Sequence, residues 1–212
     1  LDDVADIEKS VKGGAGHCFL NSGQSCNAPT KMLISAKNYD KAVEVAVATA
    51  NNTSVGDPNG EFRIGPIANK TQYEKIIKLI EIGIEEGATL VAGGVEKPDG
   101  CDKGYFIKPT VFANVTNDMT IAKEEIFGHV LVMIKYDHED EAINIANDTE
   151  YGLAGYMQGE PEHAKDVARK IRAGQVIING GARGTGAPFG GYKASGNGRE
   201  HGIHGLEECL ET

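Results

Sequence analysis

The sequence predicts an α/β fold, with an open, mostly parallel sheet and helices on both of its faces. Apolar runs of strand length alternate along the chain with amphipathic segments of helix length, which is the pattern of this fold class. The clearest unit has strand-like segments at 153–157 and 175–179 on either side of an amphipathic segment at 161–173. A strand, helix and strand at this spacing join parallel strands, which are covered on both faces.

Further elements follow from the spacing of apolar residues along the rest of the chain. Apolar positions at helical spacing predict helices at 2–20, 38–50, 71–86 and 137–148. Short apolar runs predict strands at 31–36, 88–92 and 130–134. Residues 51–69 are rich in turn-forming residues and predict a long surface loop. The stretch 105–112 is extended in character, but Pro109 should keep it from forming a regular central strand.

Length, composition and charge restrict the class of protein. A chain of 212 residues can bury a sizeable core as one large domain or two small ones. Its formal net charge of −10 argues against nucleic acid or an anionic membrane as a partner, and no apolar run approaches the roughly 20 residues that span a bilayer. The four cysteines, at positions 18, 26, 101 and 209, form no paired motif. We therefore expect a soluble, cytoplasmic protein without disulfides or a cysteine metal site.

Cys26 is the first candidate for a reactive residue. It follows a polar turn that contains glycine, in the stretch Phe-Leu-Asn-Ser-Gly-Gln-Ser-Cys-Asn-Ala-Pro at 19–29. Pro29 prevents a helix from continuing, so the sulfur should lie at a break in regular structure. The alternative is that Cys26 is a small buried hydrophobic residue, as most isolated cysteines are. Two later stretches decide between these readings.

The first of these stretches is Lys-Glu-Glu-Ile-Phe-Gly at 123–128, and the second is the glycine-rich run Pro-Phe-Gly-Gly-Tyr-Lys-Ala-Ser-Gly-Asn-Gly-Arg-Glu at 188–200. Taken alone, a Glu-Glu pair is typical of a solvated turn and a glycine-rich run is typical of a flexible loop. The glycine-rich run also matches neither of the common phosphate-binding glycine motifs. The order and separation of the three stretches carry more information than any one of them.

Together the stretches resemble the catalytic domain of the aldehyde dehydrogenase family. The cysteine signature of that family, an aromatic residue, Asn and then Gly-Gln-x-Cys, is present at 19–26, and its Glu-Glu-x-Phe-Gly signature follows about a hundred residues later at 124–128. The run Gly-Tyr-Phe-Ile-Lys-Pro-Thr-Val at 104–111 and the glycine-rich run are also similar to the family. The resemblance covers nearly the whole chain.

The resemblance implies a reaction and a role for several residues. Cys26 would be the nucleophile that attacks an aldehyde, forming a thiohemiacetal and, after hydride transfer to NAD or NADP, a thioester. Glu125 would hold the ribose hydroxyls of the nicotinamide half, and Phe127 would pack beside them. Glu200 would be either an acidic residue linked to proton movement or a carboxylate at the start of a helix. Glu124 is expected on the solvated surface. The family also implies a small aldehyde as substrate and assembly of the parent protein into a homo-oligomer.

The chain departs from the family pattern in two ways. The family usually has proline after Glu-Glu-x-Phe-Gly, whereas this chain has His129, which removes a backbone constraint and adds a titratable ring. The Glu-Leu-Gly-Gly-Lys segment that carries the family's general base does not occur in the sequence, nor does the upstream Asn of its oxyanion hole. We therefore expect residues 1–212 to be a catalytic domain cut from a longer chain, largely without the NAD(P)-binding domain and inactive alone.

Other candidates have simpler readings. His201, His204 and Glu207 could form a metal-binding face, but no further ligand spacing supports one. Lys193 is expected either to be solvated or to anchor a loop rather than to form a Schiff base, and Cys18 is expected in the core. Two rival functions stay open: a cysteine hydrolase or acyl-transfer domain that uses Cys26 without nicotinamide, and a binding protein that retains the dehydrogenase fold.

Overall fold

A computed structural model describes residues 1–182 and 184–211. The chain divides into two compact units. The first, Asp6–Asp137, is here called the cysteine unit because it contains Cys26. The second combines Leu1–Ala5 with His138–Thr212 and is called the terminal unit. The candidate nucleophile and the candidate cofactor segment therefore belong to the same unit.

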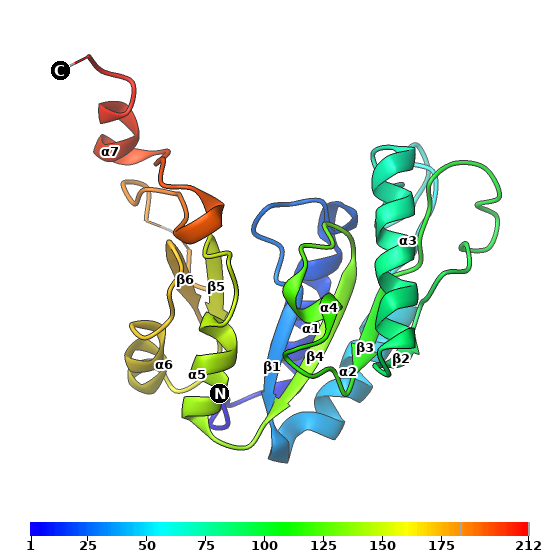
Figure 1. Ribbon diagram of the computed structural model, residues 1–212, viewed down its shortest axis with the longest axis horizontal. Coiled ribbons are helices and arrows are strands. Elements are labelled where there is room, and N and C mark those ends of the chain that lie inside the picture. The colour runs from blue at the N-terminus through cyan, green and yellow to red at the C-terminus, as the bar shows by residue number, and fades with distance from the viewer. Residues whose placement is uncertain (183, 212) are drawn as a thin grey trace. The chain divides into compact units, whose positions relative to one another are not determined.

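The cysteine unit is built on a four-stranded sheet (Figure 1). Its strands, in spatial order, are β1 (Lys31–Ser35), β4 (Val130–Tyr136), β3 (Thr110–Ala113) and β2 (Thr89–Ala92). The pairs β1–β4 and β4–β3 are parallel, and β2 is antiparallel to β3. The two inner strands are almost entirely buried, as the apolar sequence at 130–134 predicts. The predicted open, mostly parallel sheet is confirmed.

Helices cover both faces of this sheet. The cysteine unit contains the α-helices α1 (Ile7–Phe19), α2 (Tyr39–Asn51), α3 (Lys70–Glu85) and α4 (Thr120–Lys123), with 3-10 turns η1 (Leu20–Gly23) and η2 (Ala36–Asn38). Small residues of α1 and α2, such as Ala15 and Ala46, share one core cluster with Val111 of β3. The next residue, Phe112, points to the other face, where a Cβ added at Gly83 of α3 would lie 3.3 Å from its ring. The two faces therefore have different helical partners.

The terminal unit contains the predicted strand–helix–strand unit. Strands β5 (Ala154–Met157) and β6 (Gln175–Ile178) pair in parallel, and α6 (Pro161–Ala168) connects them. The unit also contains α5 (Glu139–Asn147), the 3-10 turn η3 (Lys193–Ser195) and α7 (Gly202–Glu207). Helix α6 ends at Ala168, earlier than the predicted limit of residue 173. The parallel pairing itself is confirmed.

Two predicted boundaries differ from the structure for identifiable reasons. The first helix begins at Ile7 rather than at residue 2, because the Asp6 side chain caps it by accepting a hydrogen bond from the Lys9 amide at 2.9 Å. The prediction that Pro109 excludes a central strand is wrong for the residues after it. Strand β3 starts at Thr110, whose amide donates to the His129 carbonyl at 3.0 Å. The proline precedes the ladder, so its missing N–H costs the sheet nothing.

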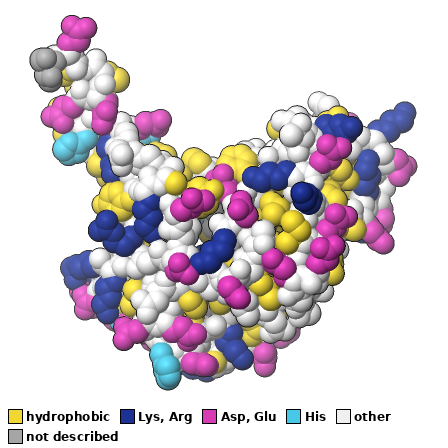
Figure 2. Space-filling model, viewed as in Figure 1, with side chains coloured by type: hydrophobic (Ala, Val, Ile, Leu, Met, Phe, Trp, Pro, Cys, Tyr) yellow, Lys and Arg dark blue, Asp and Glu magenta, His cyan; other side chains and the backbone are white. Residues whose placement is uncertain are grey.

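Charged side chains are distributed over the surface in both signs. On the face shown in Figure 2, acidic and basic side chains are interspersed. Many form exposed pairs, such as Lys41 with Glu8 at 2.9 Å, and pairs of this kind contribute little to stability. Within the described residues, none of the helices combines the length and the apolar character that crossing a membrane requires.

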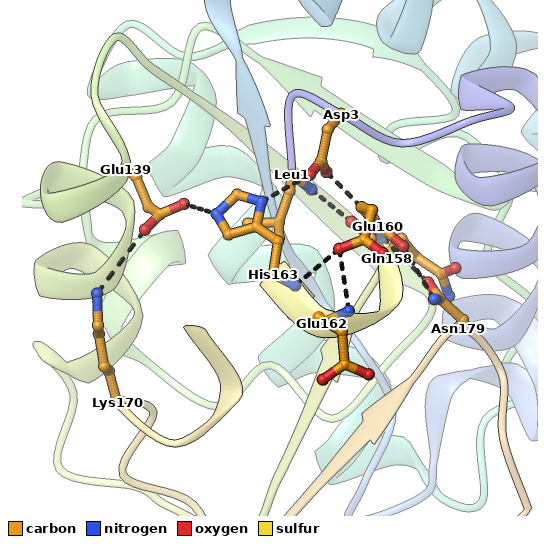
Figure 3. A network of polar contacts seen from close by, with 10 residues as sticks. Leu1, Asp3, Glu139, Gln158, Glu160, Glu162, His163, Lys170 and Asn179 are labelled. Atoms are coloured by element: carbon orange, nitrogen blue, oxygen red, sulfur yellow. Dashed lines mark hydrogen bonds and ion pairs between the residues drawn. The ribbon is translucent and has the colours of Figure 1, made fainter. Parts of the chain in front are cut away.

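A polar network around His163 stabilises the terminal unit (Figure 3). The His163 ring contacts the Asp3 carboxylate at 2.6 Å through Nδ1 and the Glu139 carboxylate through Nε2. The Glu160 side chain caps α6 and accepts hydrogen bonds from the amides of Glu162 and His163. The hydrogen bond to Asp3, followed by that to Glu139, raises the pKa of His163 above its ordinary value. The imidazolium is therefore the form that the fold favours.

This network predicts a pH-dependent stability. Because the pKa of His163 is raised in the folded protein, its contribution is complete below its ordinary value of 6.5 and is lost as the pH rises through the raised pKa. We expect His163→Gln to lower the unfolding temperature by about 1–4 °C at about pH 5.5, and by less at about pH 9. Thermal unfolding followed by circular dichroism measures this. Arg169→Gln, on the same helix, is the control, and its effect should not differ between the two pH values. An equal loss for His163→Gln at both would contradict the prediction.

Candidate active site

Cys26 is exposed and follows a turn with an unusual backbone. Helix α1 ends at Phe19, and three successive residues, Asn21, Ser22 and Gly23, then have φ values of 53°, 56° and 69°. Residues other than glycine rarely adopt this left-handed backbone conformation, so surrounding contacts must maintain it at Asn21 and Ser22. Cys26 follows on a tight turn before β1 and is exposed. The alternative reading of Cys26 as a buried hydrophobic residue is wrong.

The turn is attached to the loop that precedes α3. The Ser22 hydroxyl donates to the Gly65 carbonyl at 2.8 Å. The Gln24 side chain accepts from the Ala68 amide at 2.8 Å and donates to the Pro66 carbonyl at 3.4 Å. These contacts give the glutamine of the cysteine signature a structural role, because its amide group pairs with both a donor and an acceptor of the neighbouring loop.

The candidate cofactor segment lies between α4 and β4 and is held by α3. The Gln72 side chain donates to the carbonyls of Ile126 and Phe127 at 2.8 and 3.1 Å, and Lys75 donates to the Glu125 carbonyl at 2.6 Å. Phe127 has a φ of 55° and is half-buried, whereas the Glu125 side chain is exposed. Glu124 is exposed as predicted. Sequence reasoning missed Gln72 and Lys75, although their spacing of three places them on one face of the predicted helix.

The cysteine turn and the cofactor segment are in direct contact. A Cβ added at Gly23 would lie 2.1 Å from the carbonyl carbon of Gly128 and 2.3 Å from the amide nitrogen of His129. His129 is buried, and its Nδ1 lies 2.9 Å from the Ser22 carbonyl oxygen. Two motifs about a hundred residues apart in the sequence therefore meet at one place in the cysteine unit.

The other cysteine of this region behaves differently from Cys26. Cys18 is fully buried on α1, and its thiol contacts the Val130 carbonyl at 3.8 Å. Burial raises the pKa of Cys18 to about 12, so its sulfur stays protonated at physiological pH. The prediction that Cys18 belongs to the core is confirmed. Since the nucleophilic form of cysteine is the thiolate, the exposed Cys26 is the candidate that this region offers.

The remaining candidates lie in the terminal unit. Lys193 donates to the carbonyls of Asn147 and Thr149 at 2.9 and 3.0 Å, which confirms its predicted role in anchoring a loop. Glu200 is exposed, and its backbone pairs with Phe189 through two hydrogen bonds of 2.7 Å. His204 approaches Glu207 at 3.3 Å. Across residues 1–182 and 184–211, no three His, Cys, Asp or Glu side chains are arranged to hold a metal ion.

Comparison with known proteins places these motifs in a family. The sequence model of the aldehyde dehydrogenase family matches residues 1–212. The chain is 50% identical to 3-succinoylsemialdehyde-pyridine dehydrogenase of a Pseudomonas species, covering 100% of this chain and 44% of that protein. It is 49% identical to a putative aldehyde dehydrogenase of Staphylococcus aureus, with coverages of 100% and 45%. The chain therefore spans less than half the length of these relatives.

Solved structures agree with this assignment. A mutant of aldehyde dehydrogenase C from Pseudomonas syringae, in complex with NAD+ and octanal, superimposes with a TM-score of 0.96 at 48% identity, covering 100% of this chain and 44% of the other. The Mycobacterium tuberculosis aldehyde dehydrogenase complexed with NAD+ has a TM-score of 0.94 at 43% identity, with coverages of 98% and 43%. The chain belongs to the aldehyde dehydrogenase family.

Proposed function

We propose that the protein, at its natural length, oxidises a small aldehyde to a carboxylic acid with NAD+ or NADP+, and that Cys26 is the nucleophile. The observation that carries this proposal is the contact between the turn before an exposed Cys26 and the segment that bears Glu125 and Phe127. The nicotinamide must take a hydride from the carbon that the sulfur holds, so the sulfur and the carboxylate that binds the nicotinamide ribose need fixed positions relative to each other.

The Cys26 thiolate would attack the aldehyde carbonyl carbon, forming a C–S bond while the π electrons move to oxygen. The backbone N–H of Cys26 is suited to donate to that oxyanion, because its position depends only on the main chain of the turn. NAD(P)+, when bound, supplies the acceptor for the hydride that leaves the carbon. The carbonyl re-forms as a thioester on Cys26, and attack by water releases the acid and returns the thiol.

The residues of the cofactor segment fit one end of a nicotinamide dinucleotide. Glu125 offers an exposed carboxylate, which can only accept hydrogen bonds and therefore suits a pair of ribose hydroxyls. Phe127 offers a half-buried ring beside it. The P. syringae and M. tuberculosis structures are complexes with NAD+, which supports the same cofactor here.

An assay of the natural-length protein with a panel of aldehydes, with NAD+ and NADP+ in separate reactions, tests the proposal. We expect reduced nicotinamide and carboxylic acid in equal amounts for at least one aldehyde. Hydrolysis of thioesters or esters without nicotinamide, and no nicotinamide reduction with any aldehyde, would favour the rival cysteine hydrolase.

Residues 1–212 alone are proposed to be inactive. The sequence contains neither the family's Glu-Leu-Gly-Gly-Lys segment, which carries the general base, nor the Asn that completes the oxyanion hole. Without a base, deprotonation of Cys26 and activation of water both lose their proton acceptor. Nicotinamide reduction by the 212 residues alone would overturn this part of the proposal.

We also propose, from the family resemblance, that the natural-length protein is a homo-oligomer.

A further inference from the structure

His129 lies between two backbone carbonyl oxygens. Its side chain is 1% exposed. Nδ1 lies 2.9 Å from the carbonyl oxygen of Ser22, and Nε2 lies 2.8 Å from the carbonyl oxygen of Ile107. The ring therefore joins the turn that leads to Cys26 with the extended segment before β3. The family pattern has proline at this position, and proline could donate to neither carbonyl.

Each of the two contacts is a hydrogen bond only if a different ring nitrogen, Nδ1 or Nε2, carries a proton. A neutral imidazole carries one N–H, so it donates to one of the two carbonyls and directs a lone pair at the other. Burial lowers the pKa of His129, and the two carbonyl oxygens oppose that effect without outweighing it. The lowered pKa favours the neutral ring, whose single proton serves either Ser22 or Ile107.

The backbone of the turn indicates which carbonyl is served. Ser22 is the middle one of three left-handed residues, and a run of this kind persists only where surrounding contacts compensate for its strain. Ile107 lies outside the helices and strands and has no positive φ. A hydrogen bond to Ser22 thus maintains a conformation that would otherwise relax, whereas a hydrogen bond to Ile107 has no strained turn to maintain.

We propose that His129 is a positioning residue for Cys26: it carries its proton on Nδ1 and donates it to the Ser22 carbonyl, which fixes the turn four residues before the sulfur against the cofactor segment. The importance of this contact for catalysis rests on the proposed role of Cys26. The contact itself can be tested without substrate or cofactor, so its failure and the failure of the proposed function are distinguishable.

The protonation state can be read directly in the wild-type protein. Nitrogen-15 NMR of protein labelled at histidine distinguishes a protonated ring nitrogen from an unprotonated one. We expect one histidine that does not titrate near neutral pH and that is protonated at Nδ1 alone, and its absence from the spectrum of a His129 variant assigns it. A ring protonated at Nε2 alone would overturn the proposal, because the proton would then serve Ile107.

Two substitutions separate the contacts. In His129→Asn the amide nitrogen is bonded to Cγ, as Nδ1 is, and can still reach Ser22. In His129→Gln the amide nitrogen lies one atom further out, like Nε2, and can reach only Ile107. We expect amide hydrogen exchange in residues 20–26 to be about three- to tenfold faster in His129→Gln than in wild type, corresponding to one lost hydrogen bond, and close to wild type in His129→Asn.

Tyr39→Phe is the matched control for the loss of buried hydrogen bonds elsewhere in the unit. The Tyr39 hydroxyl, on α2, donates to the Met133 carbonyl of β4 at 3.1 Å and accepts from the Asn114 amide at 2.7 Å. Its loss should leave exchange in residues 20–26 unchanged. Faster exchange in His129→Asn than in His129→Gln, or equal exchange in all variants, would overturn the proposal. If both His129 variants fail to fold, the NMR measurement decides, with the signal assigned as the histidine that does not titrate near neutral pH.

Discussion

Replacing Cys26 by serine is expected to lower kcat for aldehyde oxidation by about four to six orders of magnitude, as the removal of a nucleophile does in enzymes that use covalent catalysis. A serine hydroxyl is far less acidic than a thiol, so a base that suffices to form the thiolate leaves the hydroxyl protonated and weakly nucleophilic. Steady-state kinetics of the natural-length protein measure the effect. The fold should be unchanged, because the Cys26 side chain is exposed and serine is nearly the same size.

Cys209→Ser is the matched control. Cys209 is the other exposed cysteine, and it lies in the terminal unit, where its thiol contacts the Gly205 carbonyl at 3.7 Å. This variant should retain wild-type kcat. If Cys26→Ser also retained activity, or if both variants lost it equally, Cys26 would not be the nucleophile.

Gly23→Ala is expected to have the largest effect on stability. Gly23 has a φ of 69°, and a Cβ at this position would lie 2.1 Å from the carbonyl carbon of Gly128. Alanine would add the cost of a left-handed conformation to an overlap with backbone that no side-chain rotation relieves. We expect the free energy of unfolding to fall by roughly 2–5 kcal/mol, as measured by urea denaturation. Activity should be lost together with it, because the cysteine turn and the cofactor segment could no longer approach.

Gly13→Ala makes the same chemical change as Gly23→Ala but is expected to raise the free energy of unfolding. Gly13 is exposed on α1 with helical φ, and a Cβ there would meet no atom within 4 Å. Because alanine favours a helix more than glycine does, the variant should be more stable by about 0.5–1 kcal/mol. A Gly23→Ala protein as stable as wild type would show that the contact between Gly23 and Gly128 does not constrain the turn.

The sequence predicted best those elements whose apolar residues have a strong period. Helix α3 and strand β4 were identified almost to their ends, because α3 presents one apolar face and β4 is buried on both sides. The sequence does not predict strand β3, because Pro109 argues against a central strand in this stretch although the strand begins only at the next residue, Thr110. The start of α1 was misplaced because Val4 fits the apolar period although the cap at Asp6 excludes it.

The candidate site was predictable in its residue types but not in its contacts. The family motifs identified Cys26, Glu125 and Phe127, and their roles remain proposals. The backbone conformation of Phe127 and the two carbonyl partners of His129 could not be predicted, because they depend on segments that are distant in sequence. His129 was recognised only as a departure from the family pattern. Its structural role is indicated by its contacts with the carbonyl oxygens of Ser22 and Ile107.

The contact between Ser22 and His129 joins residues 107 positions apart, and this separation affects how the protein assembles. Closing so long a loop carries an entropic cost that local contacts cannot offset early in folding. The parallel pairing of β1 with β4, which brings Lys31 beside Val132, faces the same delay. We therefore expect the turn that precedes Cys26, the proposed nucleophile, to become ordered only when the sheet of its unit is complete.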